Sequence, residues 1–299
     1  MTRSQGNLLL LAVALIWGSA FVAQAQPMDG VGPLTFTGIR FLLGVCVVAP
    51  LAWRDWRLVR CRAVPPEWRD ARAVAGLGVL LAFGAVLQQI GLHSTTVTNA
   101  GFLTALYVPL VPLASWLILK ERPHWSVWPT SLGCLVGTWM LSGAGRVSIG
   151  VGDSWVIASS VFWALHVFFV GRIAERIAAP FLVACAQFLV SGVVCLLVGS
   201  VSETFVLEGV WQAALPILYC GVLSVGFAYT GRVVGQRYVP SADAAIIMSG
   251  ETLFAALFGF LLMGDRLNSM GIMGCILIFV CIIAVQLMPL MEARRAARA

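Results

Sequence analysis

Two apolar stretches, QGNLLLLAVALIWGSAFVAQA at residues 5–25 and DSWVIASSVFWALHVFFVG at residues 153–171, determine the fold of this chain. Each is close to the length of about 20 residues that a helix needs to cross the hydrocarbon layer of a membrane. Neither alternates apolar and polar residues with the period of two that is typical of a membrane β-barrel strand. Both stretches are therefore predicted to be membrane-spanning helices.

The rest of the chain has the same character. Its 299 residues are 60% hydrophobic and 11% charged, and its mean hydropathy is +0.93. Soluble domains carry about 25% charged residues, because they need a wetted surface. We therefore predict an all-α integral membrane protein with ten transmembrane helices and no soluble domain. The predicted spans are residues 5–25, 33–53, 72–93, 97–119, 125–144, 153–171, 180–200, 211–231, 241–263 and 268–288.

The first span also has features of a secretory signal peptide. Arg3 precedes the apolar run, and Ala23-Gln24-Ala25 resembles a cleavage site. The correspondence between this run and residues 153–171, described below, favours a retained transmembrane helix instead.

The basic residues predict the orientation in the membrane. With a cytoplasmic N-terminus, sixteen of the 19 Lys and Arg residues fall on the cytoplasmic side, which retains basic residues during insertion. They lie near positions 3, 54–72, 120–122, 172–176, 232–237 and 294–298. The protein is predicted to lie in the cell (inner) membrane with both termini cytoplasmic. The net charge of +6 is thereby explained without a nucleic-acid partner.

The two halves of the chain repeat each other at a spacing of 144–147 residues. Asn7 precedes Trp17 by ten residues, as Asp153 precedes Trp163. Further matches are Pro33 with Pro180, Phe83 with Phe227, Gly91 with Gly235, Asn99 with Asp243 and Glu121 with Asp265. The predicted domains are a five-helix repeat at 1–146, a second five-helix repeat at 147–288 and a cytoplasmic basic tail at 289–299.

An odd number of spans in each half reverses the orientation of the second half, so the repeats are inverted. Inverted repeats allow one sequence pattern to adopt two conformations, one in each half, and their exchange opens a central site to alternate sides. The sequence therefore indicates a carrier whose substrate binds near the membrane midplane, between the halves.

Several motifs resemble those of a known superfamily. They are Trp17-Gly18, Pro33 with Arg40-Phe41, Leu119-Lys120-Glu121-Arg122, and Glu251 fourteen residues before Asp265 in Gly264-Asp265-Arg266-Leu267. Over the whole chain, the sequence resembles the drug/metabolite transporter superfamily and its EamA-type ten-helix exporters, most closely the YddG-type exporters of aromatic and other neutral amino acids. It departs from the family pattern at Thr252, where a proline commonly stands, and at Asp265, where a glutamate does.

The resemblance implies a secondary transporter that exports small amphipathic metabolites by alternating access, with aromatic and other neutral amino acids as the expected substrates. Two alternatives stay open. One is export of other metabolites or drugs, and the other is a channel-like facilitator, which would show neither saturation nor counter-transport.

Aromatic and polar residues inside the spans are the candidate binding groups. Trp17 and Trp163 hold equivalent positions within their spans, whereas tryptophan usually prefers the membrane interface. Core packing is the competing interpretation. Polar side chains inside a span need partners in the bundle or in a cavity. The predicted substrate-binding residues are Trp17, Phe21, Gln88, Tyr107, Trp163 and His166.

Glu251 lies near the centre of the ninth span, where an acidic residue costs about 2.5–3.5 kcal/mol on insertion scales. Arg40 is the one basic residue placed well inside a predicted span. Three readings of Glu251 stay open: an ion pair with Arg40, a proton-exchanging carboxylate that couples transport, and a protonated acid bonded to the backbone.

No enzyme motif accompanies these groups. Gly150-Val151-Gly152-Asp153 spells the G-x-G-D of intramembrane aspartyl proteases, but a second embedded aspartate in the right context is missing. Zinc-protease and nucleotide-binding motifs are absent, and the eight cysteines form no pairing pattern. We expect no catalytic residue, cofactor or metal. The expected partners are a small-molecule substrate and membrane lipid; a monomer is expected, and a homodimer is left open.

The orientation is tested with a thiol reagent that does not cross membranes. In a variant without Cys61, a cysteine placed at Arg62 should stay unlabelled in intact cells, because the loop at 54–72 is predicted to face the cytoplasm. Cysteines at Glu203 or Glu208 should react. Labelling at position 62 together with protection at 203 and 208 would reverse the orientation.

Overall fold

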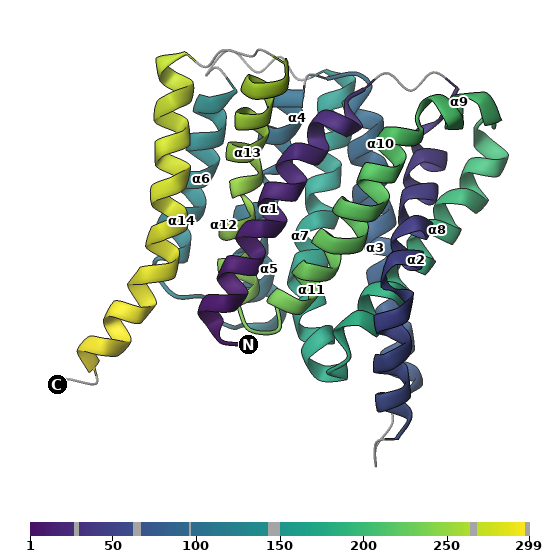
Figure 1. Cartoon of the computed structure of the whole chain (residues 1–299). Coiled ribbons are helices and arrows are strands. Elements are labelled where there is room, and N and C mark those ends of the chain that lie inside the picture. Colours follow the sequence, from purple (N-terminus) through teal and green to yellow (C-terminus); the bar gives the residue numbers. More distant parts are fainter. Residues whose placement is uncertain (27–29, 62–66, 96, 143–149, 264–267, 297–299) are drawn as a thin grey trace.

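The computed structural model in Figure 1 describes residues 1–26, 30–61, 67–95, 97–142, 150–263 and 268–296. Within these ranges every regular element is a helix. In chain order they are α1 (Arg3–Gln24), α2 (Pro33–Arg60), α3 (Trp68–Leu92), α4 (Val97–Thr104), α5 (Tyr107–Leu119), α6 (Val127–Leu141), α7 (Val151–Ile177), α8 (Pro180–Ser202), α9 (Leu207–Gln212), α10 (Ala214–Tyr219), the π-helix η1 (Cys220–Tyr229), α11 (Thr230–Gly235), α12 (Ser241–Met248), α13 (Gly250–Phe258), the π-helix η2 (Gly259–Met263) and α14 (Ser269–Ala296).

The helices form one bundle of membrane-spanning length. Nine segments of the described chain are long and apolar enough to cross a bilayer. The predicted span at 125–144 corresponds to α6, whose 15 residues reach about 22 Å; residues 143 and 144 lie outside the described residues. The prediction of an all-helical membrane protein with two inverted halves is confirmed. The predicted tail at 289–299 continues α14 as far as Ala296.

The outer surface of the bundle is apolar. Leu117, Leu197 and Ile276, on three different helices, are 64%, 64% and 59% exposed. Exposed tryptophans such as Trp68 and Trp211 lie near helix ends, where tryptophan is enriched at membrane interfaces. A soluble protein does not expose apolar side chains over its whole outer surface, so these side chains face lipid.

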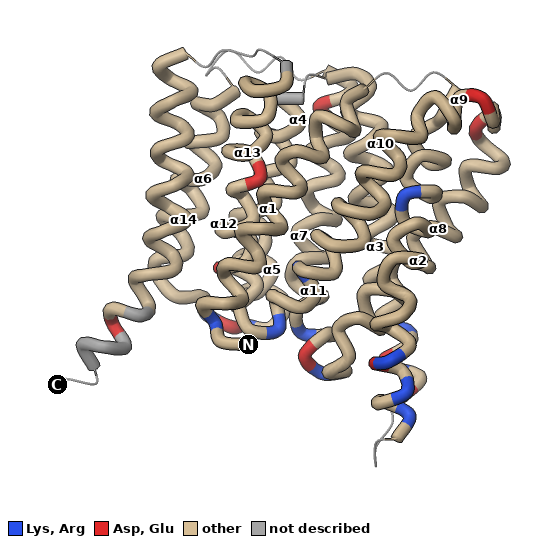
Figure 2. Tube along the Cα trace, in the orientation of Figure 1, with Lys and Arg blue, Asp and Glu red and all other residues tan. Residues whose placement is uncertain are grey.

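Charged residues gather at one end of the bundle. Figure 2 shows most Lys and Arg at the lower end, where the N-terminus and the end of α14 also lie. One basic residue departs from the predicted distribution. Arg232 was expected in a cytoplasmic segment after a span ending at 231, but it lies inside the bundle on α11 and is 1% exposed.

The two halves cap each other's helices reciprocally. Helices α2 and α8 pack side by side and begin at the equivalent prolines Pro33 and Pro180. The Glu203 carboxylate, at the end of α8, accepts hydrogen bonds from the first backbone N–H groups of α2, at 2.8 and 2.9 Å. The Asp55 carboxylate, near the end of α2, accepts hydrogen bonds from the first backbone N–H groups of α8, at 3.0 and 3.4 Å. Because helix starts leave N–H groups unpaired, each repeat completes the other.

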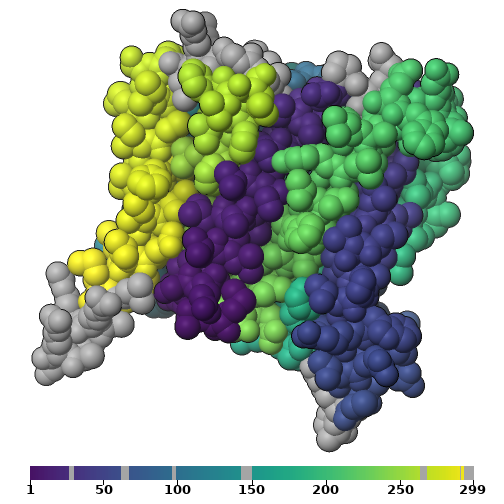
Figure 3. Space-filling view, viewed as in Figure 1, coloured from purple at the N-terminus to yellow at the C-terminus, as the bar shows by residue number. Residues whose placement is uncertain are grey.

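Each half also contributes its first helix to the other half. Helix α1 packs against η1, α11, α12 and α13 of the second half. Figure 3 shows α1, in purple, between α10 and α11 on one side and α13 on the other. Helix α7 packs against α3, α4 and α5 of the first half. The halves are therefore interlocked, and the bundle centre is lined by helices of both.

Glycine allows these interlocked helices to touch backbone to backbone. A Cβ atom on Gly91 of α3 would lie 2.7 Å from the carbonyl oxygen of Gly152 on α7. The equivalent pair, Gly6 of α1 and Gly235 of α11, approaches less closely, with 3.4 Å for the same kind of contact. Small residues at crossings permit close helix packing in membranes. One crossing lies near each end of the bundle.

Replacing Gly91 with alanine should destabilise the protein by about 1–3 kcal/mol. The new methyl group would lie too close to the backbone of α7, which cannot move aside by changing a side-chain rotamer. Gly76 lies on the same helix, and a methyl group added there would meet no atom within 4 Å. Gly76→Ala is therefore the matched control, and it should leave stability unchanged or raise it by up to about 1 kcal/mol through helix propensity. Denaturant titration in mixed micelles measures both; equal effects at the two positions would contradict the close crossing.

Candidate substrate-binding site

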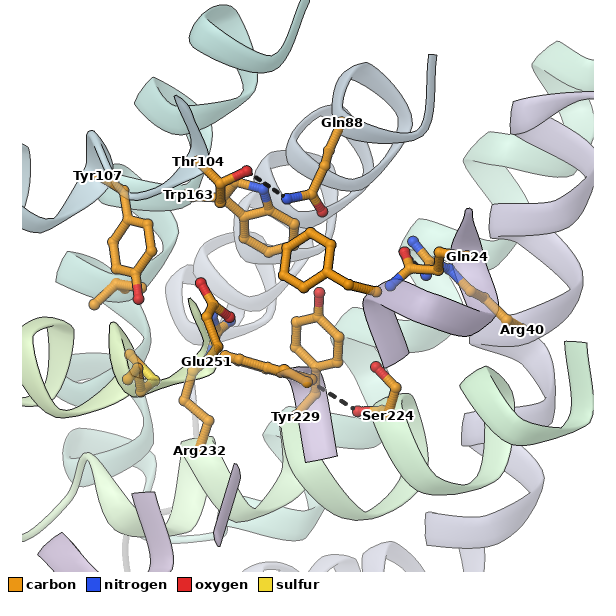
Figure 4. A pocket seen from close by; sticks show the side chains of 14 residues that line it. Gln24, Arg40, Gln88, Thr104, Tyr107, Trp163, Ser224, Tyr229, Arg232 and Glu251 are labelled. Atoms are coloured by element: carbon orange, nitrogen blue, oxygen red, sulfur yellow. Dashed lines mark hydrogen bonds between the residues drawn. The ribbon is translucent and has the colours of Figure 1, made fainter. Parts of the chain in front are cut away.

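A cavity lies at the centre of the bundle, between the two halves (Figure 4). Its volume is about 40 Å³, enough for a few water molecules. An aromatic amino acid is larger, so its entry requires the surrounding helices to separate. The lining residues come from both halves and are Trp17, Phe21, Gln24, Arg40, Gln88, Thr104, Tyr107, Trp163, Val167, Ser224, Tyr229, Arg232, Met248 and Glu251.

Two broken spans meet at this cavity. The first half is interrupted between α4 and α5, and Thr104 and Tyr107 flank the break. The second half is interrupted at Ser249 between α12 and α13, and Met248 and Glu251 flank that break. The two pairs are 144 residues apart, so the breaks are equivalent under the repeat. Discontinuous helices near the midplane are a recurrent feature of transporter binding sites.

Tyr229 is the centre of an aromatic cluster. It ends the π-helix η1, a form that is frequent at functional sites. Its ring centroid lies 4.7 Å from Trp17 and 5.9 Å from Trp163. The Trp17 indole also donates to the backbone oxygen of Ser224, at 3.4 Å. The two tryptophans that the sequence pairs thus border one cavity, each with its ring next to Tyr229.

Arg232 is surrounded by this cluster. Its guanidinium carbon lies 5.1 Å from the Tyr229 ring centre and 5.3 Å from that of Trp17, within the range of cation–π attraction. An Arg232 Nη donates to His166 Nδ1. His166 Nε2, 2.8 Å from the Gln187 amide oxygen, then carries the ring proton. A buried cation is in this way held by rings and a neutral imidazole.

Arg40 is the second buried cation of the site. Its side chain is 2% exposed, and one Nη donates to the Gln24 amide oxygen at 2.5 Å. The guanidinium also lies 5.1 Å from the ring centre of Phe36. Arg40 forms no ion pair with a carboxylate of the described residues. Figure 4 places Arg40 and Glu251 at opposite ends of the cavity.

Glu251 points into the cavity from the first turn of α13 (Figure 4). Negative charge is favourable at a helix start because of the unpaired N–H groups there. Among the described residues, neither Arg40 nor Arg232 forms an ion pair with Glu251, although the charges of Arg232 and Glu251 act on each other over a longer distance. The reading in which Glu251 pairs with Arg40 is therefore not the arrangement found. Proton exchange by Glu251 stays a prediction.

The remaining predicted residues occupy different positions. The Gln88 amide donates to Thr104 at 2.9 Å across α3 and α4, and Phe21 and Tyr107 complete the wall. His166 does not line the cavity: it is completely buried behind Arg232 and accepts a hydrogen bond from that side chain. All the other predicted residues, Trp17, Phe21, Arg40, Gln88, Tyr107, Trp163 and Glu251, lie around the one cavity.

Arg232 is the lining residue that sequence reasoning placed elsewhere, and a signal for it exists. Gln88 lies three residues before Gly91, and Arg232 lies three residues before Gly235. Because the two glycines match, Arg232 is the counterpart of a residue well inside the third span. Extending the eighth span by the same rule would have placed Arg232 inside the membrane.

A second cavity, of about 660 Å³, opens at the end of the bundle where the termini lie. Ion pairs border it: Arg3 bonds Asp243 at 2.5 Å, and Arg172 bonds Glu121. Asp243, in the first turn of α12, therefore contacts α1. The larger cavity shares no lining residue with the central one.

The comparison with known proteins agrees with this architecture. The EamA-like transporter family matches residues 4–143 and again residues 150–287, one match in each half. The chain therefore belongs to the EamA-like transporter family, and it is a multi-pass membrane protein.

Several relatives cover most of the chain. An uncharacterized transporter of Archaeoglobus fulgidus is 27% identical over 289 residues, which are 95% of this chain and 87% of that protein. The uncharacterized inner membrane transporter YedA of Escherichia coli is 25% identical, over 87% of this chain and 83% of its own. A solved crystal structure superposes with a TM-score of 0.77 at 20% identity, covering 99% of both chains, and shows the shared fold. The relatives are transporters, which favours transport over catalysis.

Double-mutant cycles test which arginine Glu251 interacts with. Glu251→Gln and Arg232→Gln should show a coupling of about 0.5–3 kcal/mol in unfolding free energy, because each variant leaves the other charge buried. The same cycle with Arg40→Gln should show coupling within about 0.5 kcal/mol. A larger coupling to Arg40 than to Arg232 would overturn this assignment. Denaturant titration of the four variants in each cycle supplies the values.

Proposed function

We propose that this protein is a secondary transporter that exports small amphipathic metabolites, with aromatic and other neutral amino acids as its substrates. The observation that carries the proposal is the aromatic and polar cavity at the junction of the inverted halves. Trp17, Trp163 and Tyr229 offer stacking surfaces for an indole or phenyl group. Gln88, Arg40 and Glu251 offer the polar and charged contacts that an amino acid needs. The resemblance to YddG-type exporters supports the same substrates.

Transport follows from exchanging the conformations of the two halves. The contacts of Gly91 with Gly152 and of Gly6 with Gly235 lie near opposite ends of the bundle, and both are formed around a contracted cavity. Loosening one crossing at a time would open the cavity to one side only, which is alternating access. Because one chain supplies both halves, we propose that a monomer suffices. The basic end of the bundle would face the cytoplasm of a cell (inner) membrane.

Two other functions make different predictions in the same assay. An exporter of other metabolites or drugs would saturate with those compounds and not with amino acids. A channel-like facilitator would show flux that rises in proportion to concentration. The interruption of both spans at a small central cavity favours a carrier.

Counterflow in liposomes tests the proposal. Vesicles loaded with unlabelled tryptophan should take up labelled tryptophan transiently above equilibrium, and the initial rate should saturate. Trp17→Ala and Trp163→Ala should each lower that rate about tenfold, because stacking and apolar contact are lost. Flux without saturation or counterflow would contradict a carrier, and the absence of amino-acid flux would contradict the substrate class.

Trp155→Ala is the matched control for Trp163→Ala. Trp155 lies on the same helix, α7, but is 42% exposed on the outer surface. The control should transport at the wild-type rate at equal protein yield. If Trp155→Ala lowers transport as much as Trp163→Ala does, the loss reflects helix packing instead of the cavity.

A further inference from the structure

The residues around the central cavity carry hydrogen-bond donors that have no acceptors. Within the described chain, the buried Arg40 Nε, Trp163 Nε1 and Arg232 Nε groups lack a partner. All three are N–H groups, which can only donate. No acceptor atom of a described lining residue is buried and unpartnered in the same way. These buried donors need acceptors, which a ligand with acceptor atoms would supply beside the Glu251 carboxylate that points into the cavity.

The charges of the lining residues also favour a ligand with a negative charge. Arg40 and Arg232 are cationic side chains, whereas Glu251 is the one acidic side chain among the described lining residues. Arg40 forms no ion pair with a described carboxylate, and its contacts are with neutral groups, Gln24 and nearby aromatic rings. A buried cation without a counter-charge is unfavourable in a low-dielectric interior.

The aromatic surface is meanwhile unavailable to a cationic ligand. Aromatic clusters attract ammonium groups through cation–π contacts. Here the guanidinium of Arg232 already lies over the rings of Trp17, Trp163 and Tyr229, at 5.3, 6.0 and 5.1 Å. An incoming cation would have to displace or approach this fixed positive charge.

We propose that the cavity selects substrates by a carboxylate group, which binds the Arg40 guanidinium while the apolar body of the substrate contacts Trp17, Phe21 and Trp163. A carboxylate supplies acceptor oxygens and the missing negative charge together, and its planar shape matches a guanidinium. This inference rests on the proposed function, since it names the chemical class of the substrate for the same site. The required feature is the carboxylate; cations with the same ring system are excluded.

The repeat suggests a substitution that the fold should tolerate. Arg40 lies seven residues after Pro33, and Gln187 lies seven residues after the equivalent Pro180. Gln187 is fully buried in the second half. Glutamine thus already occupies the equivalent place in one repeat, so Arg40→Gln removes the charge with a shorter side chain that the fold accepts at that place in the other repeat. Arg40→Lys keeps the charge without the planar fork.

Two ligands that differ only in charge provide the test. The probes are 3-(indol-3-yl)propionate and its primary amide, and their binding to the purified protein in lipid nanodiscs is measured by calorimetry. The wild type should bind the acid about tenfold to a hundredfold more tightly than the amide, the range expected for a lost charged hydrogen bond. Arg40→Gln should remove this preference, and Arg40→Lys should retain part of it.

A surface arginine serves as the control. Arg172 pairs with Glu121 at the end of the bundle and lies outside the central cavity. Arg172→Gln should keep the preference for the acid within about twofold. A loss of preference in this variant would show a general effect of net charge and overturn the role of Arg40.

The outcomes separate this inference from the proposed function. Equal binding of acid and amide by the wild type overturns carboxylate selection while leaving an exporter of amphipathic metabolites intact. Failure of both probes and of tryptophan to bind contradicts the proposed function itself. Occupation of Arg40 by an inorganic anion is a further outcome: acid and amide would then bind equally in chloride buffer, and a preference for the acid would appear only in chloride-free buffer. That result would overturn carboxylate selection at physiological salt. If Arg40→Gln does not fold, the comparison of acid and amide in the wild type still decides.

Discussion

The burial of two guanidinium groups and one carboxylate at the centre of a membrane bundle constrains the structure around them. The hydrocarbon of the bilayer cannot solvate these groups, so each needs partners supplied by the protein, by the few water molecules that the cavity can hold or by a ligand. Arg232 has three rings, an imidazole and the field of Glu251. Arg40 has an amide and rings. Because Arg40 has fewer partners than Arg232, it is the cation of the cavity that is available to a ligand.

The inverted repeat explains how such a cavity is built from one sequence pattern. Each half interrupts its fourth span at the midplane, and each half places its first helix among the helices of the other. The breaks bring Tyr107 and Glu251 to the cavity, and the exchanged helices bring Trp17 and Trp163. Equivalent positions of the two repeats thus line the same central cavity. Divergence between the halves, such as Arg40 against Gln187, makes that space asymmetric and able to orient a ligand.

Much of the fold could be predicted from the sequence, because the length of an apolar run reports directly on a membrane span. The nearly constant spacing between matching glycines, prolines and tryptophans likewise revealed the two halves. The tryptophans and Glu251 stood out because such side chains are rare within a span. The site was harder to complete. A charged residue near a predicted helix end looks like a loop residue, which is why Arg232 was placed outside the membrane although its counterpart Gln88 was not.

Side-chain direction was the other missing information. His166 and Trp163 are three residues apart on α7, yet only Trp163 lines the cavity, while His166 lies behind Arg232. Periodicity places two such residues on neighbouring faces of a helix but cannot tell which face meets the cavity until the packing of both halves is known. The absence of an ion pair between Glu251 and Arg40 in the described residues was unpredictable for the same reason, since it depends on how the helices of both halves pack.

The central claim is that one cavity between the halves binds an organic carboxylate at Arg40. The most direct measurement is an electron cryomicroscopy structure of the protein in nanodiscs with 3-(indol-3-yl)propionate bound. The account predicts ligand density between the two halves, with the indole against Trp17 and Trp163 and the carboxylate within hydrogen-bonding distance of the Arg40 guanidinium. Density only in the larger cavity at the end of the bundle, or a carboxylate directed away from Arg40, would contradict it.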